Sequence, residues 1–493
     1  MKNNSVIKPI MLIAAAALFL SFCLDMSIGS IRGSMYVCLV ICCLIIAFVF
    51  RKSISEKALT ASVMSGFLLK LAYVLYTPVW CRQHDVVDFG AGEGHAAYME
   101  YILSHKALPD FDPRSVWAFF QPPLHHGISA VWMWLGIRTG LSEARIHKNV
   151  QVLTLVYMCL LMIVVLGICK ELNMRYGGRL VTMLIVGFHP IYILMSGSIN
   201  NDALAVMLSM VSIYIAILWY KDPGIGKIIM LAISIGLAMS AKLSSGLIAP
   251  PIAVLMLYRC MTDTDGLKNT SKLMSYILRF AVFAVIVFPL GLWWPIRNKI
   301  LFDMPAGYIP EVGEQVKVGI APMIFDIRTS SPFLYMKANG FDHDEYNLIL
   351  ATVKSSLFGE GDFAHLSQAV TVLGWMLLIL SVCVFILQIM GMIRTCAVSE
   401  ASPEKGIKIF FVCLVICLIG GYALFAISGR NLSAMDPRYC APVVSVLSIF
   451  AGLWYDRLEV LSRKMTRAFI MTAAAAFATV SGVFYILIGV YGG

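Results

Sequence analysis

Long apolar segments alternate with short polar ones along this chain, and the pattern predicts membrane-spanning helices. A segment of about 20 apolar residues is long enough to cross a bilayer as a helix. The predicted spans are residues 8–28, 35–50, 58–79, 150–169, 180–197, 203–220, 228–241, 245–258, 280–295, 367–393, 407–427, 441–455 and 468–490. We therefore expect an all-α polytopic membrane protein with about 13 transmembrane helices, forming a single membrane-embedded domain over residues 1–493.

The composition agrees with a membrane protein and argues against a nucleic-acid partner. Hydrophobic residues make up 59% of the chain and charged residues 13%, whereas soluble domains are about half apolar and a quarter charged. The net charge of +10 comes from Lys and Arg in short loops on one predicted side. That distribution follows the positive-inside rule, so we expect a multi-pass protein of the plasma membrane with its N-terminus inside.

Segment 122–137 decides the orientation of everything that follows it. The segment is apolar, but it is short, begins with two prolines and ends beside Arg138. As a span it would place the later basic loops outside, whereas as an interfacial helix it places them inside. We therefore predict an interfacial helix, with two large outer loops at 80–148 and 296–366 and a short charged one at 428–440.

The first outer loop begins with two carboxylates directly after a predicted span. They belong to the segment Gln83-His84-Asp85-Val86-Val87-Asp88. A carboxylate near the membrane surface is suited to act as a general base or to hold a metal ion. The alternative is that Asp85 and Asp88 are solvated loop acids or cap a following helix.

The same loop then predicts an amphipathic helix that ends at Leu108-Pro109. His95, Tyr98, Met99 and Ile102 share one face by their spacing, and Glu93 lies off that face. His95 is either a structural residue of this helix or a residue that faces a site.

A pair of prolines followed by two histidines, Gln121-Pro122-Pro123-Leu124-His125-His126, predicts the start of another helix. The two histidines could be metal ligands, substrate contacts or buried hydrogen-bonded imidazoles. Asp85, His95 and His125 together have the chemistry to hold a divalent cation, and the sequence leaves the need for one open.

Further polar residues stand at the outer ends of later spans. Asn201 and Asp202 precede a predicted span and could cap its helix. Lys242, Arg297 and Arg438 each stand at an outer helix end, where they could anchor the helix at the interface or bind a lipid phosphate.

Taken in order, these motifs resemble the membrane glycosyltransferases of the C superfamily. The resemblance is greatest to family 39, the branch of protein O-mannosyltransferases and lipid A aminoarabinose transferases. The segments that carry it are His84-Asp85, Leu108-Pro109, residues 121–126, residues 196–202, the Gly-rich helix that ends at Lys242, and residues 436–442.

The resemblance implies a polyprenyl-phosphate-linked sugar as donor and a site that opens to the extracytoplasmic side. It also implies two interfacial helices in the first outer loop, inversion at the anomeric carbon, and Asp85 as the catalytic base. We expect the substrates to contact His84, Asp88, Glu93, His95, Gln121, His125, His126, Asn201, Asp202, Lys242, Arg297, Arg438 and Tyr439.

The acceptor and the class of activity stay open at this point. Val86 follows Asp85 where eukaryotic protein mannosyltransferases have Glu, so the acceptor could be a glycan, a lipid or a protein. The alternative function is a lipid or lipid-sugar transporter without bond chemistry. A transporter predicts ionisable residues inside spans and symmetry-related repeats. Only Asp25, Lys70 and His189 are such residues, and the sequence shows no repeat.

Overall fold

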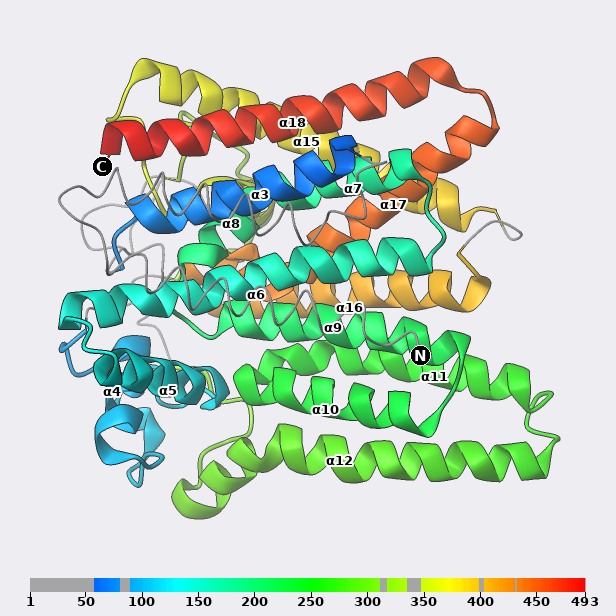
Figure 1. Cartoon of the computed structure of the whole chain (residues 1–493), viewed down its shortest axis with the longest axis horizontal. Helices are drawn as coiled ribbons and strands as arrows, with labels where there is room; N and C mark the ends of the chain where they lie inside the picture. Colours follow the sequence, from blue (N-terminus) through cyan, green and yellow to red (C-terminus); the bar gives the residue numbers. More distant parts are fainter. Residues whose placement is uncertain are drawn as a thin grey trace.

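The computed structural model describes residues 57–79, 89–310, 317–334, 347–398, 403–430 and 432–492, and every regular element in these ranges is a helix (Figure 1). The α-helices are α3 (Lys57–Tyr76), α4 (Gly94–His105), α5 (Leu124–Arg138), α6 (Glu143–Glu171), α7 (Tyr176–Phe188), α8 (Pro190–Gly197), α9 (Asp202–Lys221), α10 (Ile225–Ala241), α11 (Ala249–Asp263), α12 (Thr270–Phe302), α13 (Ile320–Phe325), α14 (Leu348–Phe358), α15 (Gln368–Cys396), α16 (Lys405–Gly429), α17 (Pro442–Val460) and α18 (Lys464–Gly492). The short 3-10 helices are η3 (Pro113–Ser115), η4 (Leu243–Ile248), η6 (Leu432–Met435) and η7 (Pro437–Cys440).

Eight helices of the described ranges are long and apolar enough to cross a membrane, or nine if the bent pair α7 and α8 is one span. The predicted spans from residue 58 onward all fall on helices. The first two predicted spans, 8–28 and 35–50, lie outside the described residues, as do His84, Asp85 and Asp88. The chain is therefore a multi-pass membrane protein, and the number of 13 spans stays a prediction.

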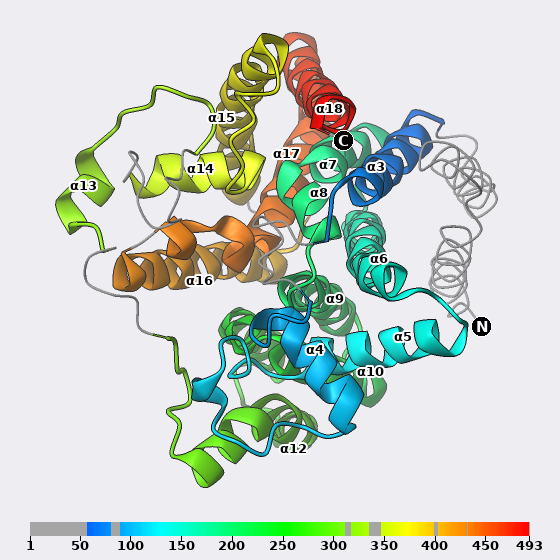
Figure 2. The ribbon, with the colours of Figure 1, turned by 90° about the vertical axis from the view of Figure 1, so that its left-hand side faces the viewer.

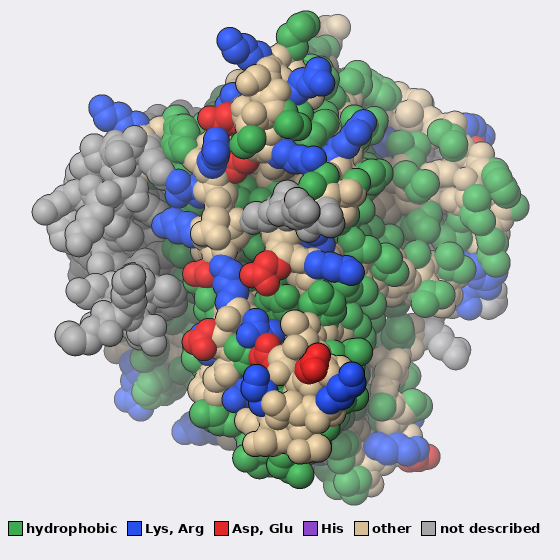
Figure 3. All heavy atoms as spheres, turned by 90° about the vertical axis from the view of Figure 1, so that its right-hand side faces the viewer, with side chains coloured by type: hydrophobic (Ala, Val, Ile, Leu, Met, Phe, Trp, Pro, Cys, Tyr) green, Lys and Arg blue, Asp and Glu red, His purple; other side chains and the backbone are tan. Residues whose placement is uncertain are grey.

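The long helices lie side by side, and their connections sort to the two ends of the bundle. The turns from α6 to α7, α9 to α10, α11 to α12 and α17 to α18 lie at the right-hand end in Figure 1. Figure 3 looks at this end and shows numerous Lys and Arg side chains. The opposite end carries α4, α5 and the C-terminal end of α12.

Helices α4 and α5 are both inclined to the bundle axis. In Figure 2, which looks along the bundle, they are seen from the side, whereas α9 and α12 are seen end-on. Met99 of α4, Met133 of α5 and Ile146 of α6 are buried against one another.

A break in the helix separates α7 from α8 and bends the pair by 46°. Pro190 causes it, because proline lacks the N–H that would continue the hydrogen-bond ladder. Other helices bind the freed carbonyls: Lys70 Nζ donates to the Gly187 carbonyl at 2.6 Å, and Ser481 Oγ donates to the Phe188 carbonyl at 2.7 Å. Lys70, one of the three ionisable residues inside predicted spans, therefore has a structural partner.

Helix α12 is longer than the sequence predicted. It runs through Pro289 and Pro295 to Phe302, whereas the predicted span ended at residue 295. The first residues of the predicted second outer loop over 296–366, Arg297 among them, thus form the last turns of this helix, and the outer location of the loop stays a prediction. The described part of the remaining loop contains α13 and α14.

Helices α7 and α17 pack in close contact at the end opposite α4. A methyl group on Gly178 would lie 2.5 Å from the Gly452 carbonyl, so only glycine allows this approach. Asp456 of α17 accepts hydrogen bonds from the backbone N–H groups of Arg175 and Gly178, both at 2.7 Å. The carboxylate thereby satisfies N–H groups that the first turn of α7 leaves without helical partners.

Candidate active site

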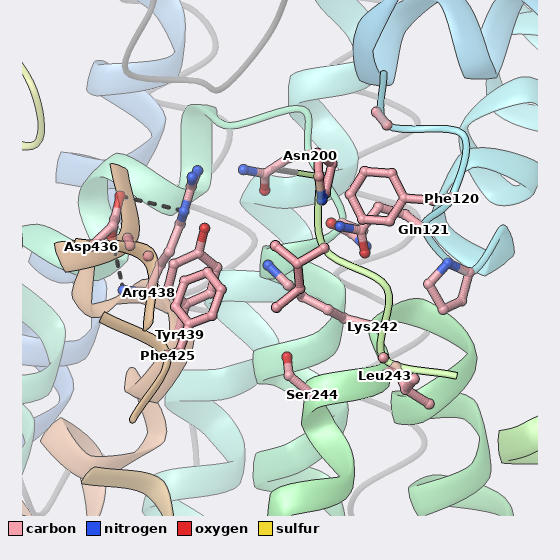
Figure 4. A pocket seen from close by; sticks show the side chains of 18 of the residues that line it. Phe120, Gln121, Asn200, Lys242, Leu243, Ser244, Phe425, Asp436, Arg438 and Tyr439 are labelled. Atoms are coloured by element: carbon pink, nitrogen blue, oxygen red, sulfur yellow. Dashed lines mark hydrogen bonds and ion pairs between the residues drawn. The ribbon is translucent and has the colours of Figure 1, made fainter. Parts of the chain in front are cut away.

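A cavity of about 1440 Å³ lies at the end of the bundle that carries α4 (Figure 4). Its wall combines segments that are far apart in the chain. They are the first outer loop (Glu93, His95, Trp117, Phe120, Gln121), the α8–α9 connection (Ser198, Asn200, Asn201), the α10–η4 junction (Lys242, Leu243, Ser244), the segment after α12 (Met304–Pro310), and residues of α14, α16 and η7. The structure thus brings most of the predicted polar segments to one place.

Two cations of this wall, Lys242 and Arg438, contact the buried carboxylate of Asp202, which is not itself among the lining residues. Lys242 Nζ forms an ion pair with Asp202 Oδ1, and Arg438 Nε lies 3.4 Å from Asp202 Oδ2. The exposed fraction of the Asp202 side chain is 4%, against 13% for each cation. Asp436 contributes a second carboxylate at 3.3 Å from Arg438 Nε. Lys242 also lies over the ring of Tyr439, 4.3 Å from its centroid.

Local backbone structure places each of these side chains. Helix α10 ends at Ala241, and Lys242 adopts an extended conformation before η4 begins. At η7, the Asp436 carboxylate accepts from the Arg438 N–H at 2.9 Å and Pro437 occupies the first position, a strong helix-start signal. The aspartate that caps η7 thereby also contacts the Arg438 guanidinium.

Two amide side chains join the first outer loop to the bundle. Asn201 Nδ2 donates to the Ala241 carbonyl at 2.7 Å and to Gln121 Oε1 at 3.4 Å. Neither Asn201 nor Asp202 acts through its side chain as the expected cap of α9. Asn200 has that role instead, since its Oδ1 accepts from the Asp202 N–H at 3.1 Å. The Asp202 carboxylate does not cap the helix and instead pairs with the cations. Figure 4 shows one of these cations, Lys242, between Arg438 and Gln121.

Three histidines form a cluster behind the wall, and only His95 reaches the cavity. His95 Nδ1 and His126 Nε2 share a hydrogen bond of 2.9 Å, and His126 stacks on Tyr98. His125 Nε2 donates to the Ile199 carbonyl at 3.0 Å. Burial lowers the pKa of His125 to about 4 and that of His126 well below its usual value. The sequence left three roles open for His125 and His126: metal ligands, substrate contacts or buried imidazoles. Their burial favours the third role, as neutral imidazoles.

Two further predicted residues have different surroundings. Glu93 lies in the cavity wall immediately before α4. Arg297 is not among the lining residues: it donates to the Pro109 carbonyl and, at 2.9 Å, to Asn298 Oδ1, while its guanidinium lies over Trp294. Arg297 therefore fastens the first outer loop to α12, and the expectation that it contacts substrate has no support in its position.

Several lining residues had not been singled out from the sequence. Trp117 and Phe120 present aromatic rings, and Tyr308 packs edge-on against Phe120 at 5.7 Å. Glu360 follows α14 after Gly359, whose φ of +60° suits glycine. A Gly-Glu-Gly-Asp turn after a helix was the available sequence signal for Glu360, but nothing local indicated that the turn reaches the cavity.

The described ranges contain no group of three or more His, Cys, Asp or Glu side chains placed to hold a metal ion. Of the predicted ligands, His95 and His125 lie in this part of the chain and Asp85 does not. Nδ1 of His95 is hydrogen-bonded to His126, and Nε2 of His125 is hydrogen-bonded to the Ile199 carbonyl. A divalent cation therefore stays an untested prediction.

Comparisons with known proteins agree with this architecture. Residues 143–300 match the family model described as dolichyl-phosphate-mannose-protein mannosyltransferase, and no curated protein matches the sequence. The fold is similar to that of the oligosaccharyltransferase AglB from Archaeoglobus fulgidus in complex with an inhibitory peptide and a dolichol-phosphate. The TM-score is 0.52 at 13% identity, over 90% of this chain and 56% of that chain. ArnT from Cupriavidus metallidurans bound to undecaprenyl phosphate gives a TM-score of 0.48 at 15% identity, over 86% of this chain and 76% of that chain.

The chain thus spans a little over half the length of the oligosaccharyltransferase whose fold it shares. Residues 143–300 are therefore similar to that mannosyltransferase family, and the helical fold as a whole is similar to that of the oligosaccharyltransferase.

Proposed function

We propose that this protein transfers a sugar, with inversion, from a polyprenyl-phosphate-linked donor to an acceptor on the extracytoplasmic face of the membrane. The observation that carries the proposal is the position of Lys242 and Arg438 in a cavity within a membrane protein. Their side chains come from segments almost 200 residues apart and converge on Asp202.

Apolar and polar side chains both line the cavity, and Lys242 and Arg438 are among the polar ones. Apolar residues of α8, η4 and α16 line one part, among them Leu194, Leu247 and Phe425. Amide, carboxylate and aromatic side chains line the part next to the first outer loop. A lipid chain would occupy the first part and a sugar the second, which leaves the linking phosphate beside Lys242 and Arg438.

The phosphate is the group on which negative charge develops during transfer. The bond between the anomeric carbon and the phosphate oxygen breaks, and its electron pair goes to the phosphate. Lys242 and Arg438 would stabilise that charge in surroundings that exclude most water. Arg438 is suited to this because its guanidinium presents several donors in a fixed arrangement.

The acceptor hydroxyl attacks from the opposite side of the sugar and loses its proton. We assign the proton to Asp85, on the family resemblance and on its place at the start of the first outer loop. His95 and Gln121 stand in the cavity wall contributed by the same loop, where they would orient the hydroxyl. Orientation is a large part of catalysis when the leaving group is already good.

The membrane orientation is part of the proposal. Helices α4 and α5 are inclined to the bundle, as interfacial helices would be (Figure 2), and residues at the start of α4 and before α5 line the cavity. Lys and Arg gather at the opposite end (Figure 3), and the positive-inside rule assigns that end to the cytoplasm. The cavity then opens on the extracytoplasmic side.

The test is sugar transfer by the purified full-length protein in proteoliposomes that contain polyprenyl-phosphate sugars. Wild type should release polyprenyl phosphate in an acceptor-dependent reaction. Asp85→Asn should lower the rate by at least ~100-fold, as expected for loss of a general base, whereas Asp110→Asn, which changes an exposed acid of the same loop, is the control. Full activity of Asp85→Asn would remove the assignment of Asp85. Movement of intact donor across the bilayer without any transfer would instead favour the transporter alternative.

A further inference from the structure

Asp202 contacts both cations that are proposed to bind the lipid phosphate. Its two oxygens are divided between them: Oδ1 pairs with Lys242, and Oδ2 lies 3.4 Å from Arg438 Nε. The carboxylate is almost buried, with 4% of its side chain exposed. A phosphate that binds these cations therefore meets a fixed negative charge in direct contact with them.

Asp436 adds a second negative charge on the other side of Arg438, at 3.3 Å from its Nε. Asp436 also caps η7. Asp202 is the carboxylate with a contact to each of the two positive groups in the described part of the chain. Loss of the Asp202 charge should therefore change the affinity of any anion that binds both Lys242 and Arg438.

The two lipids that would use this site carry different charges. The donor is a phosphodiester with one negative charge. The product is a phosphate monoester, whose second ionisation near pH 6 gives it about −1.5 to −2 at neutral pH. Repulsion by a fixed carboxylate rises with the charge of the ligand and is strong where little water screens it. The product therefore experiences Asp202 more strongly than the donor does.

We propose that Asp202 keeps the affinity for the polyprenyl phosphate product low, so that the product leaves and the next donor binds. The inference rests on the proposed function, because it takes Lys242 and Arg438 as the phosphate site. Asp202 contributes no atom to the bonds that change. Its carboxylate acts by repelling the negative charge of the departing phosphate.

The experiment measures binding to the full-length protein in nanodiscs. The probes are a polyprenyl phosphate, its methyl phosphodiester and the uncharged polyprenol, all of one chain length. Asp202→Asn removes the charge and keeps the shape. It should lower the Kd of the monoester by about tenfold or more, lower that of the diester less, and leave that of the polyprenol unchanged. Asp202→Glu, which restores the charge, should bind the monoester no more tightly than wild type.

Disruption of structure cannot imitate this result, because damage weakens binding. An unchanged or higher monoester Kd in Asp202→Asn, with polyprenol binding intact, would overturn the inference. Wild type supplies a measurement that needs no variant: its monoester should bind no more than about tenfold tighter than the diester, and a larger preference also overturns the inference. If wild type binds the polyprenol as well as either phosphate, the phosphate site itself fails, and the proposed function fails with it.

Discussion

At the scale of single residues, the neighbours of a side chain decide between roles that its type leaves open. Lys242 and Arg297 both stand at helix ends near the first outer loop. Lys242 lines the cavity and pairs with Asp202, whereas Arg297 binds the Pro109 carbonyl behind the wall. Both were expected to contact substrate, and only Lys242 has a position that supports this.

Lys242 provides a direct test of the phosphate site. Lys242→Gln should weaken binding of a polyprenyl phosphate by about 10- to 100-fold. The phosphate loses a hydrogen bond to a charged group, and the negative charge of Asp202 is then balanced by one cation fewer. Lys299→Gln is the matched control, since Lys299 is exposed and pairs with Asp303 in the last turn of α12. Equal affinities of the two variants in a binding assay would contradict the assignment.

His125 predicts a dependence of stability on pH. Its folded-state pKa is about 4 because burial disfavours the charged form, whereas the unfolded chain has a pKa near 6.5. The stabilisation is therefore complete above pH 6.5 and is lost as the pH falls toward 4. The loss should reach roughly 2 kcal/mol at pH 5.

The measurement is the thermal unfolding midpoint of the detergent-solubilised protein between pH 7.5 and 5. His125→Gln keeps an N–H donor for the Ile199 carbonyl but cannot titrate, so its midpoint should fall less over the same range. An equal fall in both proteins would show that other groups determine the acid sensitivity.

At the scale of elements, close contacts between helices depend on residues without side chains. Helices α7 and α17 approach through Gly178 and Gly452, and Asp456 binds the first turn of α7. The sequence predicted both spans from their apolar length, yet it contained no signal that these two glycines face each other.

Gly178→Ala should therefore destabilise the protein by about 1–3 kcal/mol, the usual range for an overpacked contact. The added methyl would clash with Asp456 Oδ2 and lie 2.5 Å from the Gly452 carbonyl, so the backbone must move. In Gly420→Ala of α16 the methyl would meet nothing within 4 Å, and this control should keep its unfolding midpoint or gain slightly. A midpoint of Gly178→Ala equal to that of the control would contradict the packing.

At the scale of the whole molecule, the sorting of connections predicts the orientation in the membrane. The start of α6 lies at the end with the cavity, and the turn between α11 and α12 lies at the opposite end (Figure 1). Ala144→Cys should react with a membrane-impermeant maleimide added to intact cells, whereas Lys268→Cys should react only after lysis. The parent protein, labelled in parallel, reports the background of native cysteines. The reverse pattern would place the cavity on the cytoplasmic side.

The sequence alone determined the class of fold and the identity of most lining segments. Apolar length is enough to predict spans, because a bilayer leaves few alternatives for about 20 consecutive apolar residues. Polar groups at the ends of spans were also informative, because polar groups are seldom placed near lipid without a partner or a function. Glu93, His95, Gln121, Asn201, Lys242, Arg438 and Tyr439, all expected from the sequence to contact substrate, line the cavity.

Only the tertiary structure decided how those groups combine. It placed Asp202 between Lys242 and Arg438, buried His125 and His126 behind the wall, and took Arg297 out of it. The physical reason is that charge pairing and burial depend on distances between segments far apart in the chain. Hydrophobic periodicity describes one helix against its surroundings, and it contains no information about which helix ends meet.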